Sequence, residues 1–293
     1  MLNDNRTDYL SRLEAILLQE ATASPRCFDY FSKKQNAHGN IDGSCRKAMV
    51  TWIQQVQTTL SLSPNTVYIA MSIFDRYLSS GKGNSTRVLK EQSKFQLAAI
   101  TAFYTAIKIH EPIVLGLDML LVLCRNAYSE ADFISMEVDI LTAIEWRVSY
   151  HTAMDVARTL LELIRDDGLL SSVDVDRLIK GCESEMSTAI ADIRSSCCKP
   201  SELGIRCVEI ALGELSKLTA TKKEAICIRM WKAYNVDLSM MGGTPLWTSS
   251  YKSNAINSSS SSNNNNNNNC QSSTLVRSVS MSPIIVCHTA QQA

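Results

Sequence analysis

The sequence has no excess of charge of either sign and no long apolar run. Its 293 residues include 29 basic and 29 acidic side chains, so it lacks the net positive charge that is typical of proteins that bind DNA, RNA or acidic membranes. The two longest apolar stretches, 95–107 and 113–124, fall short of the roughly 20 residues that a helix needs to cross a bilayer. We therefore expect neither a nucleic acid nor a membrane as a partner.

The sequence also lacks a secretory leader and the cysteine spacing of a metal site. Its first nine residues are polar and no apolar segment follows them, which argues against a signal peptide. There are ten cysteines but no Cys-x-x-Cys, and Cys197 and Cys198 are neighbours. We expect reduced and mostly buried thiols in an intracellular protein, with no metal site and no cofactor.

Sequence motifs of known catalytic sites are absent as well. His110-Glu111 has no second histidine, and Pro112 would break the helix that a zinc-protease motif needs. The stretch 81–86 loosely resembles a phosphate-binding loop, but Arg76 stands where that motif has its first glycine. No Gly-x-Ser-x-Gly occurs either. We therefore expect a surface loop at 81–86 and a protein that is not an enzyme.

Helical periodicity runs through most of the chain. The stretch 95–107 carries no charge, contains four alanines and is bracketed by Lys94 and Lys108. A helix that is apolar on every side is buried among other helices. We predict that 95–107 is the central helix of a small helical domain.

Amphipathic helices are predicted on both sides of this central one. Ser63 and Pro64 are typical of a helix N-cap and first position, and Ser129 opens a capping box. The stretch 79–90 is predicted to be a polar loop, and no strand pattern competes with the helices. The flanking helices of the first half are predicted at 7–20, 45–60, 64–78, 115–126 and 130–144.

The second half repeats the pattern more faintly, with Thr221 expected to cap its last helix. Its helices are predicted at 155–164, 171–193, 201–215 and 221–234. The fold class is therefore all-α, with two consecutive helical bundles.

The composition changes after residue 241. Serines fill 258–262 and asparagines fill 263–269. Such a segment cannot bury enough apolar surface to offset the entropy of ordering it, so we predict a disordered C-terminal tail. The expected divisions are an N-terminal helix and loop, two helical domains and the tail, at 1–43, 44–148, 149–241 and 242–293.

Four charged residues lie where a helical core is expected. Arg46 begins one helix, Asp75 lies in the apolar stripe of the next, Lys108 ends the central helix and Glu137 follows the inward-facing Met136. Each of the four charges taken alone is compatible with an ordinary solvated side chain.

Together with their neighbours, these residues resemble the cyclin box. In that family an Arg, an Asp, a Leu, a Lys and a Glu form a signature, and here they fall on Arg46, Asp75, Leu97, Lys108 and Glu137. The resemblance covers about residues 20–150 and implies two cyclin-fold bundles, of which the second is divergent. The segments that carry it are Cys-Arg-Lys-Ala-Met-Val-Thr-Trp-Ile (45–53), Phe-Asp-Arg-Tyr-Leu-Ser (74–79), Phe-Gln-Leu-Ala-Ala (95–99), Ala-Ile-Lys-Ile-His-Glu (106–111) and Met-Glu-x-x-Ile-Leu (136–141).

The resemblance implies roles for these residues. Arg46 and Asp75 would form a buried ion pair between the first two helices of the box, with Leu97 in the core. Lys108 and Glu137 would hydrogen-bond the backbone of a cyclin-dependent kinase beside its regulatory helix. The implied function is that of an activating regulatory subunit of a Ser/Thr kinase in cell-cycle control, in the nucleus, the cytoplasm or both.

Finer features most resemble D-type cyclins, in particular Arg-Lys before Thr-Trp and the segment 200–202, although the Leu-x-Cys-x-Glu motif of D-types is absent. Ser282-Pro283 is a minimal site for proline-directed kinases and is a candidate phosphosite. The family's docking patch for kinase substrates or inhibitors maps to four residues, of which the first two could equally be plain core: Met49, Trp52, Gln55 and Gln96.

Two alternatives stay open at this point. A cyclin in nutrient or phosphate signalling would carry the same box, because the box alone does not name the pathway. A cyclin-fold transcription factor or scaffold would share the fold without activating a kinase. A transcription factor of this kind would be expected to have a basic surface and a zinc ribbon, which the balanced charge and the cysteine spacing do not favour.

Overall fold

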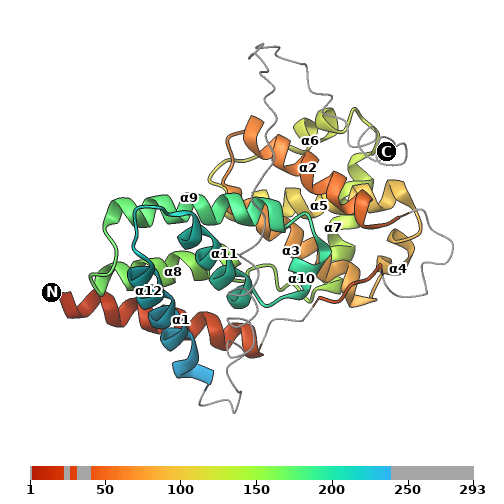
Figure 1. The fold of residues 1–293 in the computed structure, drawn as a ribbon. Coiled ribbons are helices and arrows are strands. Elements are labelled where there is room, and N and C mark those ends of the chain that lie inside the picture. The colour runs from red at the N-terminus through yellow and green to blue at the C-terminus, as the bar shows by residue number, and fades with distance from the viewer. Residues whose placement is uncertain (1, 23–26, 32–40, 239–293) are drawn as a thin grey trace, which may run out of the picture.

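The chain folds into two helical bundles that lie side by side (Figure 1). The structure, a computed structural model, describes residues 2–22, 27–31 and 41–238, and no strand occurs within these ranges. The predicted all-α fold is confirmed, while the tail predicted at 242–293 lies outside the described residues. The helices are α1 (Leu2–Thr22), α2 (Gly43–Thr59), α3 (Pro64–Ser80), α4 (Ser85–Val88), α5 (Gln92–His110), α6 (Leu117–Leu123), α7 (Glu130–Ala143), α8 (Ala153–Asp166), α9 (Ser172–Ala189), α10 (Ile193–Cys197), α11 (Pro200–Glu214) and α12 (Ala220–Leu238).

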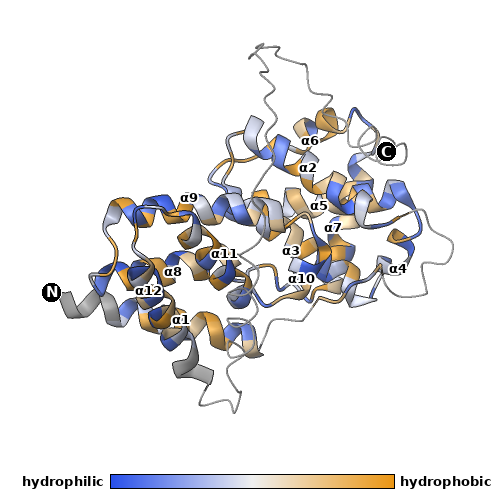
Figure 2. Cartoon of the chain, in the orientation of Figure 1, coloured by the Kyte–Doolittle hydropathy of each residue, from blue (hydrophilic) through white to orange (hydrophobic). Residues whose placement is uncertain are grey.

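Helix α5 is the buried centre of the first bundle, as predicted. It contacts α2, α3, α4 and α7, and every residue from Phe95 to Phe103 is buried. The ring of Phe95 meets Phe74 of α3 edge to face, with the ring centroids 5.0 Å apart. Figure 2 shows apolar residues gathered where the helices face one another. Neither α5 nor any other helix in the described ranges is long and apolar enough to cross a membrane.

The stretch 79–90, predicted to be a polar loop, is partly helical. Helix α3 continues to Ser80 and ends at Gly81, whose φ of 65° lies in the left-handed region that favours glycine. The single turn of α4 follows, and Val88 and Leu89 at its end are buried in the core. One helical turn is too short to produce a periodic pattern, so periodicity could not predict α4.

Three helices, α8, α9 and α11, pack on one another to form the second bundle, and α12 contacts α8 and α11. Helix α11 approaches α8 closely at Gly204. A Cβ at this position would lie 2.5 Å from the carbonyl oxygen of Ala153. Glycine therefore sets how near these two helices can come.

Helix α1 packs on the second bundle, although it precedes the first bundle in the sequence. It contacts α8 and α12, and its apolar face buries Leu13 and Ile16. The carboxylate of Glu20 accepts hydrogen bonds from the backbone N–H of Ser201 (2.8 Å) and from its hydroxyl (2.7 Å). The sequence pattern identified the apolar face of this helix but could not tell which bundle would cover it.

The helix caps follow the predictions with one exception. The side chain of Ser63 caps α3, and Ser129 forms a capping box at α7. The prediction that Thr221 caps the last helix is wrong, because α12 already begins before it. The hydroxyl of Thr219 instead accepts a hydrogen bond from the backbone N–H of Lys222 (3.3 Å).

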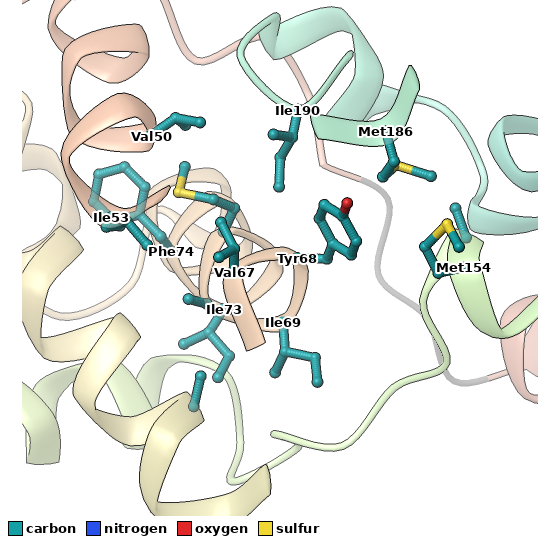
Figure 3. Close-up of a cluster of buried hydrophobic side chains, with 14 of the residues drawn as sticks. Val50, Ile53, Val67, Tyr68, Ile69, Ile73, Phe74, Met154, Met186 and Ile190 are labelled. Carbon is teal, nitrogen blue, oxygen red and sulfur yellow. The ribbon is translucent and has the colours of Figure 1, made fainter. Parts of the chain in front are cut away.

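The two bundles meet where α3 faces α9. Tyr68 of α3 lies next to Met186 and Ile190 of the second bundle (Figure 3), and its hydroxyl donates to the carbonyl of Glu183 at 3.2 Å. Helix α9 ends at Ala189, earlier than predicted, and the chain then turns into the short α10. This early turn brings the segment between α9 and α11 against the first bundle.

Candidate functional site

Arg46 and Asp75 form an ion pair in the interior of the molecule. The Nε of Arg46 donates to Asp75 Oδ1 at 2.9 Å, and its Nη2 donates to Oδ2 at 2.7 Å. Both side chains are almost completely removed from solvent, with exposures of 0% and 1%. The two-pronged geometry matches the planar guanidinium to the carboxylate and ties α2 to α3.

The same pair also binds three further segments, and no sequence motif predicted these contacts. Tyr30, which precedes α2, donates its hydroxyl to Asp75 Oδ1 at 2.8 Å. The Nη1 of Arg46 donates to the carbonyl of Ile190 at 2.7 Å, and its Nη2 also donates to Ser196 Oγ at 2.9 Å. Because Ile190 and Ser196 belong to the second bundle, the ion pair joins the two bundles as well as two helices.

The electrostatics of this cluster keep its protons in place. Burial, and after it the negative charge of Asp75, raise the pKa of Tyr30 well above its ordinary value, so the phenol remains a donor. Burial acts to lower the pKa of Arg46, but the charge of Asp75 and the hydrogen bonds to it outweigh burial and raise this pKa overall. The Tyr30 phenol and the Arg46 guanidinium therefore keep their protons near neutral pH and act as hydrogen-bond donors of a structural cluster.

Lys108 and Glu137 form a second pair, which is open to solvent. Lys108 Nζ lies 2.5 Å from Glu137 Oε1, and the side chains are 40% and 20% exposed. Thr105 Oγ1 donates to the same carboxylate oxygen at 2.9 Å, and the ammonium of Lys108 lies 4.7 Å from the centroid of the Tyr104 ring. The C-terminal end of α5 and the middle of α7 thus present one cation and one anion side by side at the surface.

Exposed apolar residues lie close to Lys108 and Glu137 in the sequence. Ile134 and Val138 of α7 are each more than half exposed. Ile134 precedes Glu137 by three residues and therefore lies on the same face of the helix, and Val138 is the next residue along the chain. Ile109 follows Lys108 directly and is also exposed. Beyond the end of α5, Val114 is almost fully exposed. Charged hydrogen-bonding groups set among exposed apolar side chains are typical of a protein-binding surface.

The four residues of the predicted docking patch are mostly inaccessible. Met49 and Trp52 have 0% exposure, and Gln96 is also buried, with its side-chain oxygen accepting from the hydroxyl of Tyr128 at 3.2 Å. Only Gln55 is partly exposed. Met49 and Trp52 are therefore core residues, which is one of the two alternatives that the sequence left open, and a docking role for this patch stays a prediction. Leu97, the fifth residue of the signature, is buried in α5.

The described residues contain no metal-binding cluster. Within the described ranges, no three His, Cys, Asp or Glu side chains lie close enough together to hold a metal ion. The cysteines of these ranges form no disulfide with one another. Burial raises the pKa of Cys124 and of Cys182 to about 12, so these thiols remain neutral and are poor nucleophiles.

The sequence of the first bundle matches a known protein family. The family described as "Cyclin, N-terminal domain" matches residues 12–149, a range that includes both charged pairs. Residues 12–149, a little under half of the chain, therefore form a cyclin N-terminal domain.

Named cyclins match over different lengths. The chain is 31% identical over 129 residues to a G2/mitotic-specific cyclin-B3 of Canis lupus familiaris, a match that covers 43% of this chain and 9% of the relative. It is 25% identical over 203 residues to a putative cyclin-A3-1 of Arabidopsis thaliana, a match that covers 69% of this chain and 54% of the relative. It is 26% identical over 163 residues to a G1/S-specific cyclin CCN1 of Candida albicans, a match that covers 53% of this chain and 22% of the relative. The chain thus spans at most about half the length of these curated relatives.

A solved cyclin structure has the same fold. The X-ray structure of a viral cyclin from herpesvirus saimiri aligns with a TM-score of 0.52 and 16% sequence identity, over 76% of this chain and 98% of the viral one. Because that alignment extends beyond the family match, it includes part of the second bundle. At 16% identity this alignment shows a shared fold alone. The likeness to D-type cyclins stays a prediction, and Ser282 lies outside the described residues.

Proposed function

We propose that this cyclin is the activating regulatory subunit of a cyclin-dependent Ser/Thr kinase and controls cell-cycle progression. The observation that carries the proposal is the surface formed by Lys108 and Glu137 with Ile109, Ile134 and Val138. The relatives whose printed names mention G1/S or mitosis support the cell-cycle assignment. We propose the nucleus, the cytoplasm or both as the location.

The surface acts by holding a partner segment in one position. In the free chain Lys108 and Glu137 satisfy each other, and in the complex they turn to backbone groups of the kinase beside its regulatory helix. The lysine donates to a carbonyl and the glutamate accepts from an N–H, while the exposed isoleucines and valine bury apolar surface against the kinase. A kinase is active when its regulatory helix supports a Lys–Glu pair in its own active site.

Activation therefore needs no chemistry from the cyclin. The kinase alternates between an inactive and an active arrangement, and a partner that binds the active one more tightly shifts the population toward it. The rigid first bundle suits this role, because α5 and α7 hold the two charges on buried supports. The exposed pair is the only part of the five-residue signature that a kinase could reach, since Arg46, Asp75 and Leu97 are buried.

Affinity capture tests the proposal. Tagged wild-type chain, expressed in dividing cells, should retain a cyclin-dependent kinase that mass spectrometry identifies and that phosphorylates a histone substrate. Lys108→Ala combined with Glu137→Ala should reduce the captured kinase at least about a hundredfold, because two charged hydrogen bonds are lost.

A matched control is available on the same bundle. Lys82 and Glu145 form an exposed pair at 2.7 Å, and Lys82→Ala with Glu145→Ala removes the same charges away from the proposed surface. This control variant should capture the kinase like the wild type. Capture of a kinase of a nutrient-signalling pathway would favour the alternative pathway, and capture of transcription factors without a kinase would favour the scaffold.

A further inference from the structure

A cavity of about 320 Å³ lies between the two bundles. Helix α3 forms one wall, with Ser72 and Arg76, and the connector between α7 and α8 forms another, with Tyr150 and His151. The segment from α10 to α11 closes it with Cys197 and Lys199. Its apolar part includes Tyr68, Ile69, Met186 and Ile190, which Figure 3 shows at the meeting point of the bundles. None of the residues of the proposed kinase-binding surface lines this cavity.

Arg76 is a buried cation that the described protein groups only partly satisfy. Its side chain is 6% exposed. Its Nη2 donates to the backbone carbonyl of Arg147, and the Tyr150 ring covers one face of the guanidinium with its centroid 4.3 Å from Cζ. Its Nε and Nη1, which carry three N–H groups, have no hydrogen-bond partner. Burial lowers the pKa of Arg76 from its ordinary value, which is the expected effect of a charge without a counterion.

The acidic groups around the cavity are already engaged elsewhere. The carboxylate of Asp75 binds Arg46, Tyr30 and the hydroxyl of Ser196. Glu20 accepts hydrogen bonds from the backbone and hydroxyl of Ser201, as described above. Burial, and after it the charge of Asp75, raise the pKa of Cys27 to about 12, so this lining thiol is neutral and supplies no negative charge.

Asp75 is paired with Arg46, so the lining charges without an ion pair among the described residues are Glu20, Arg76 and Lys199, and their balance is positive. Arg76 and Lys199 supply the positive charge. A buried guanidinium with free N–H groups is a strong binder of oxygen anions, because charge-assisted hydrogen bonds form in surroundings that exclude most water. The cavity volume exceeds several times the roughly 30 Å³ that one water molecule occupies in the liquid, so a small polyatomic ion fits.

We propose that the cavity between the bundles binds a small free oxyanion of the phosphate type, with Arg76 as its principal ligand and Lys199 as a second cation. The Nε and Nη1 groups of Arg76 are covered from solvent, so an ion in the cavity binds them once the guanidinium turns toward it. Such an ion would contact α3, the connector and the α10–α11 segment at once. Binding therefore couples the two bundles and stabilises their relative arrangement, independently of any kinase.

Phosphate titration of the purified full-length chain tests this inference. Inorganic phosphate should raise the melting temperature to a plateau, while sodium chloride at matched ionic strength should not, because a specific ligand of the folded state stabilises it by mass action. Isothermal titration calorimetry should show saturable binding of inorganic phosphate. A phosphoserine peptide should bind much more weakly, because a peptide chain is too large for a cavity of about 320 Å³. Tighter binding of the peptide than of phosphate would overturn the proposal.

Variants separate the cavity from general ion effects. Arg76→Met should weaken phosphate binding at least about tenfold, because charged hydrogen bonds are lost. Arg87→Gln removes an exposed arginine on α4 and should bind phosphate like the wild type. If Arg76→Met does not fold, Lys199→Gln provides the second test, and it should weaken binding several-fold. Absence of saturable binding to the wild type, or equal binding by wild type and folded Arg76→Met, would overturn the proposal.

Discussion

At the scale of single residues, Arg46 binds partners in both bundles, and its position in the pattern of α2 could not predict all of them. Its guanidinium binds Asp75 of α3, the carbonyl of Ile190 and the hydroxyl of Ser196. Resemblance to a family could suggest the pairing with Asp75, because both residues belong to the signature. The partners in the second bundle are more than a hundred residues away in the sequence and carry no periodic or motif signal.

Removing either member of this pair should destabilise the free chain. Arg46→Ala leaves the Asp75 carboxylate buried without its counterion, and Asp75→Ala does the reverse, so each should cost about 3–5 kcal/mol of unfolding free energy. Urea unfolding followed by circular dichroism measures the loss. The double variant Lys108→Ala, Glu137→Ala should change stability by less than about 1 kcal/mol, because exposed pairs contribute little. Equal destabilisation by both kinds of variant would show that the division into structural and surface charges is wrong.

The phenol of Tyr30 should make stability depend on pH at the alkaline end. Its pKa in the folded chain lies above the ordinary value of 10.0, so its contribution is complete below about pH 10 and is lost as the pH rises through the folded pKa. Tyr30→Phe removes the hydrogen bond to Asp75 and should cost about 1.5–3 kcal/mol at neutral pH.

Urea midpoints of wild type and Tyr30→Phe, measured at neutral pH and at about pH 11, check this expectation. The difference between the two proteins should shrink at the higher pH, because only the wild type must keep a buried phenol protonated. A difference that does not vary with pH would mean that Tyr30 does not remain neutral for the reason given.

At the scale of helices, periodicity and capping predicted most of the elements. The uncharged stretch 95–107 proved to be the buried α5, and Ser63 and Ser129 cap α3 and α7. The single turn α4 and the early end of α9 were missed, because a few buried residues such as Val88 give no repeating pattern. The covering of α1 by the second bundle depends on tertiary packing, about which a helix pattern contains no information.

The close approach of α11 and α8 gives a test at this scale. Gly204→Ala places a Cβ against the carbonyl oxygen of Ala153, and it should destabilise the chain by about 1–3 kcal/mol through overpacking. Gly213→Ala lies in the same helix with nothing within 4 Å of the added Cβ, and it should stabilise by about 0.4–1 kcal/mol. Thermal unfolding of both variants checks that the melting temperature falls in Gly204→Ala and rises in Gly213→Ala. A neutral or stabilising Gly204→Ala would mean that the two helices can separate without cost.

At the scale of the whole molecule, the buried charged pair joins the two bundles, and the exposed charged pair is available to a partner. Arg46 and Asp75 hold the bundles together, while Lys108 and Glu137 remain at the surface of the first bundle. For the predicted docking patch, the sequence left open whether Met49 and Trp52 are core residues, and both are buried. Met49 and Trp52 have the spacing of a helix stripe, and spacing alone cannot tell a covered stripe from an open one.

The tail beyond the described residues is expected to set the lifetime of the protein. Its composition predicts no fold, and Ser282-Pro283 suits a proline-directed kinase of the class that this cyclin would activate. We expect that phosphorylation of Ser282 feeds ubiquitin-dependent turnover. Truncation after Met241, and Ser282→Ala in the full chain, should both lengthen the half-life in a translation-shutoff experiment and leave kinase activation intact. Unchanged decay of both variants, or loss of activation on truncation, would refute this role.

The central claim is that Lys108 and Glu137 hold the kinase, and an equilibrium measurement with purified proteins tests it most directly. The dissociation constant between the cyclin and the kinase that it captures should rise at least about a hundredfold in Lys108→Ala, Glu137→Ala. The Lys82→Ala, Glu145→Ala control should bind like the wild type. Unchanged affinity of the Lys108, Glu137 variant, or equal weakening of the control, would contradict the account.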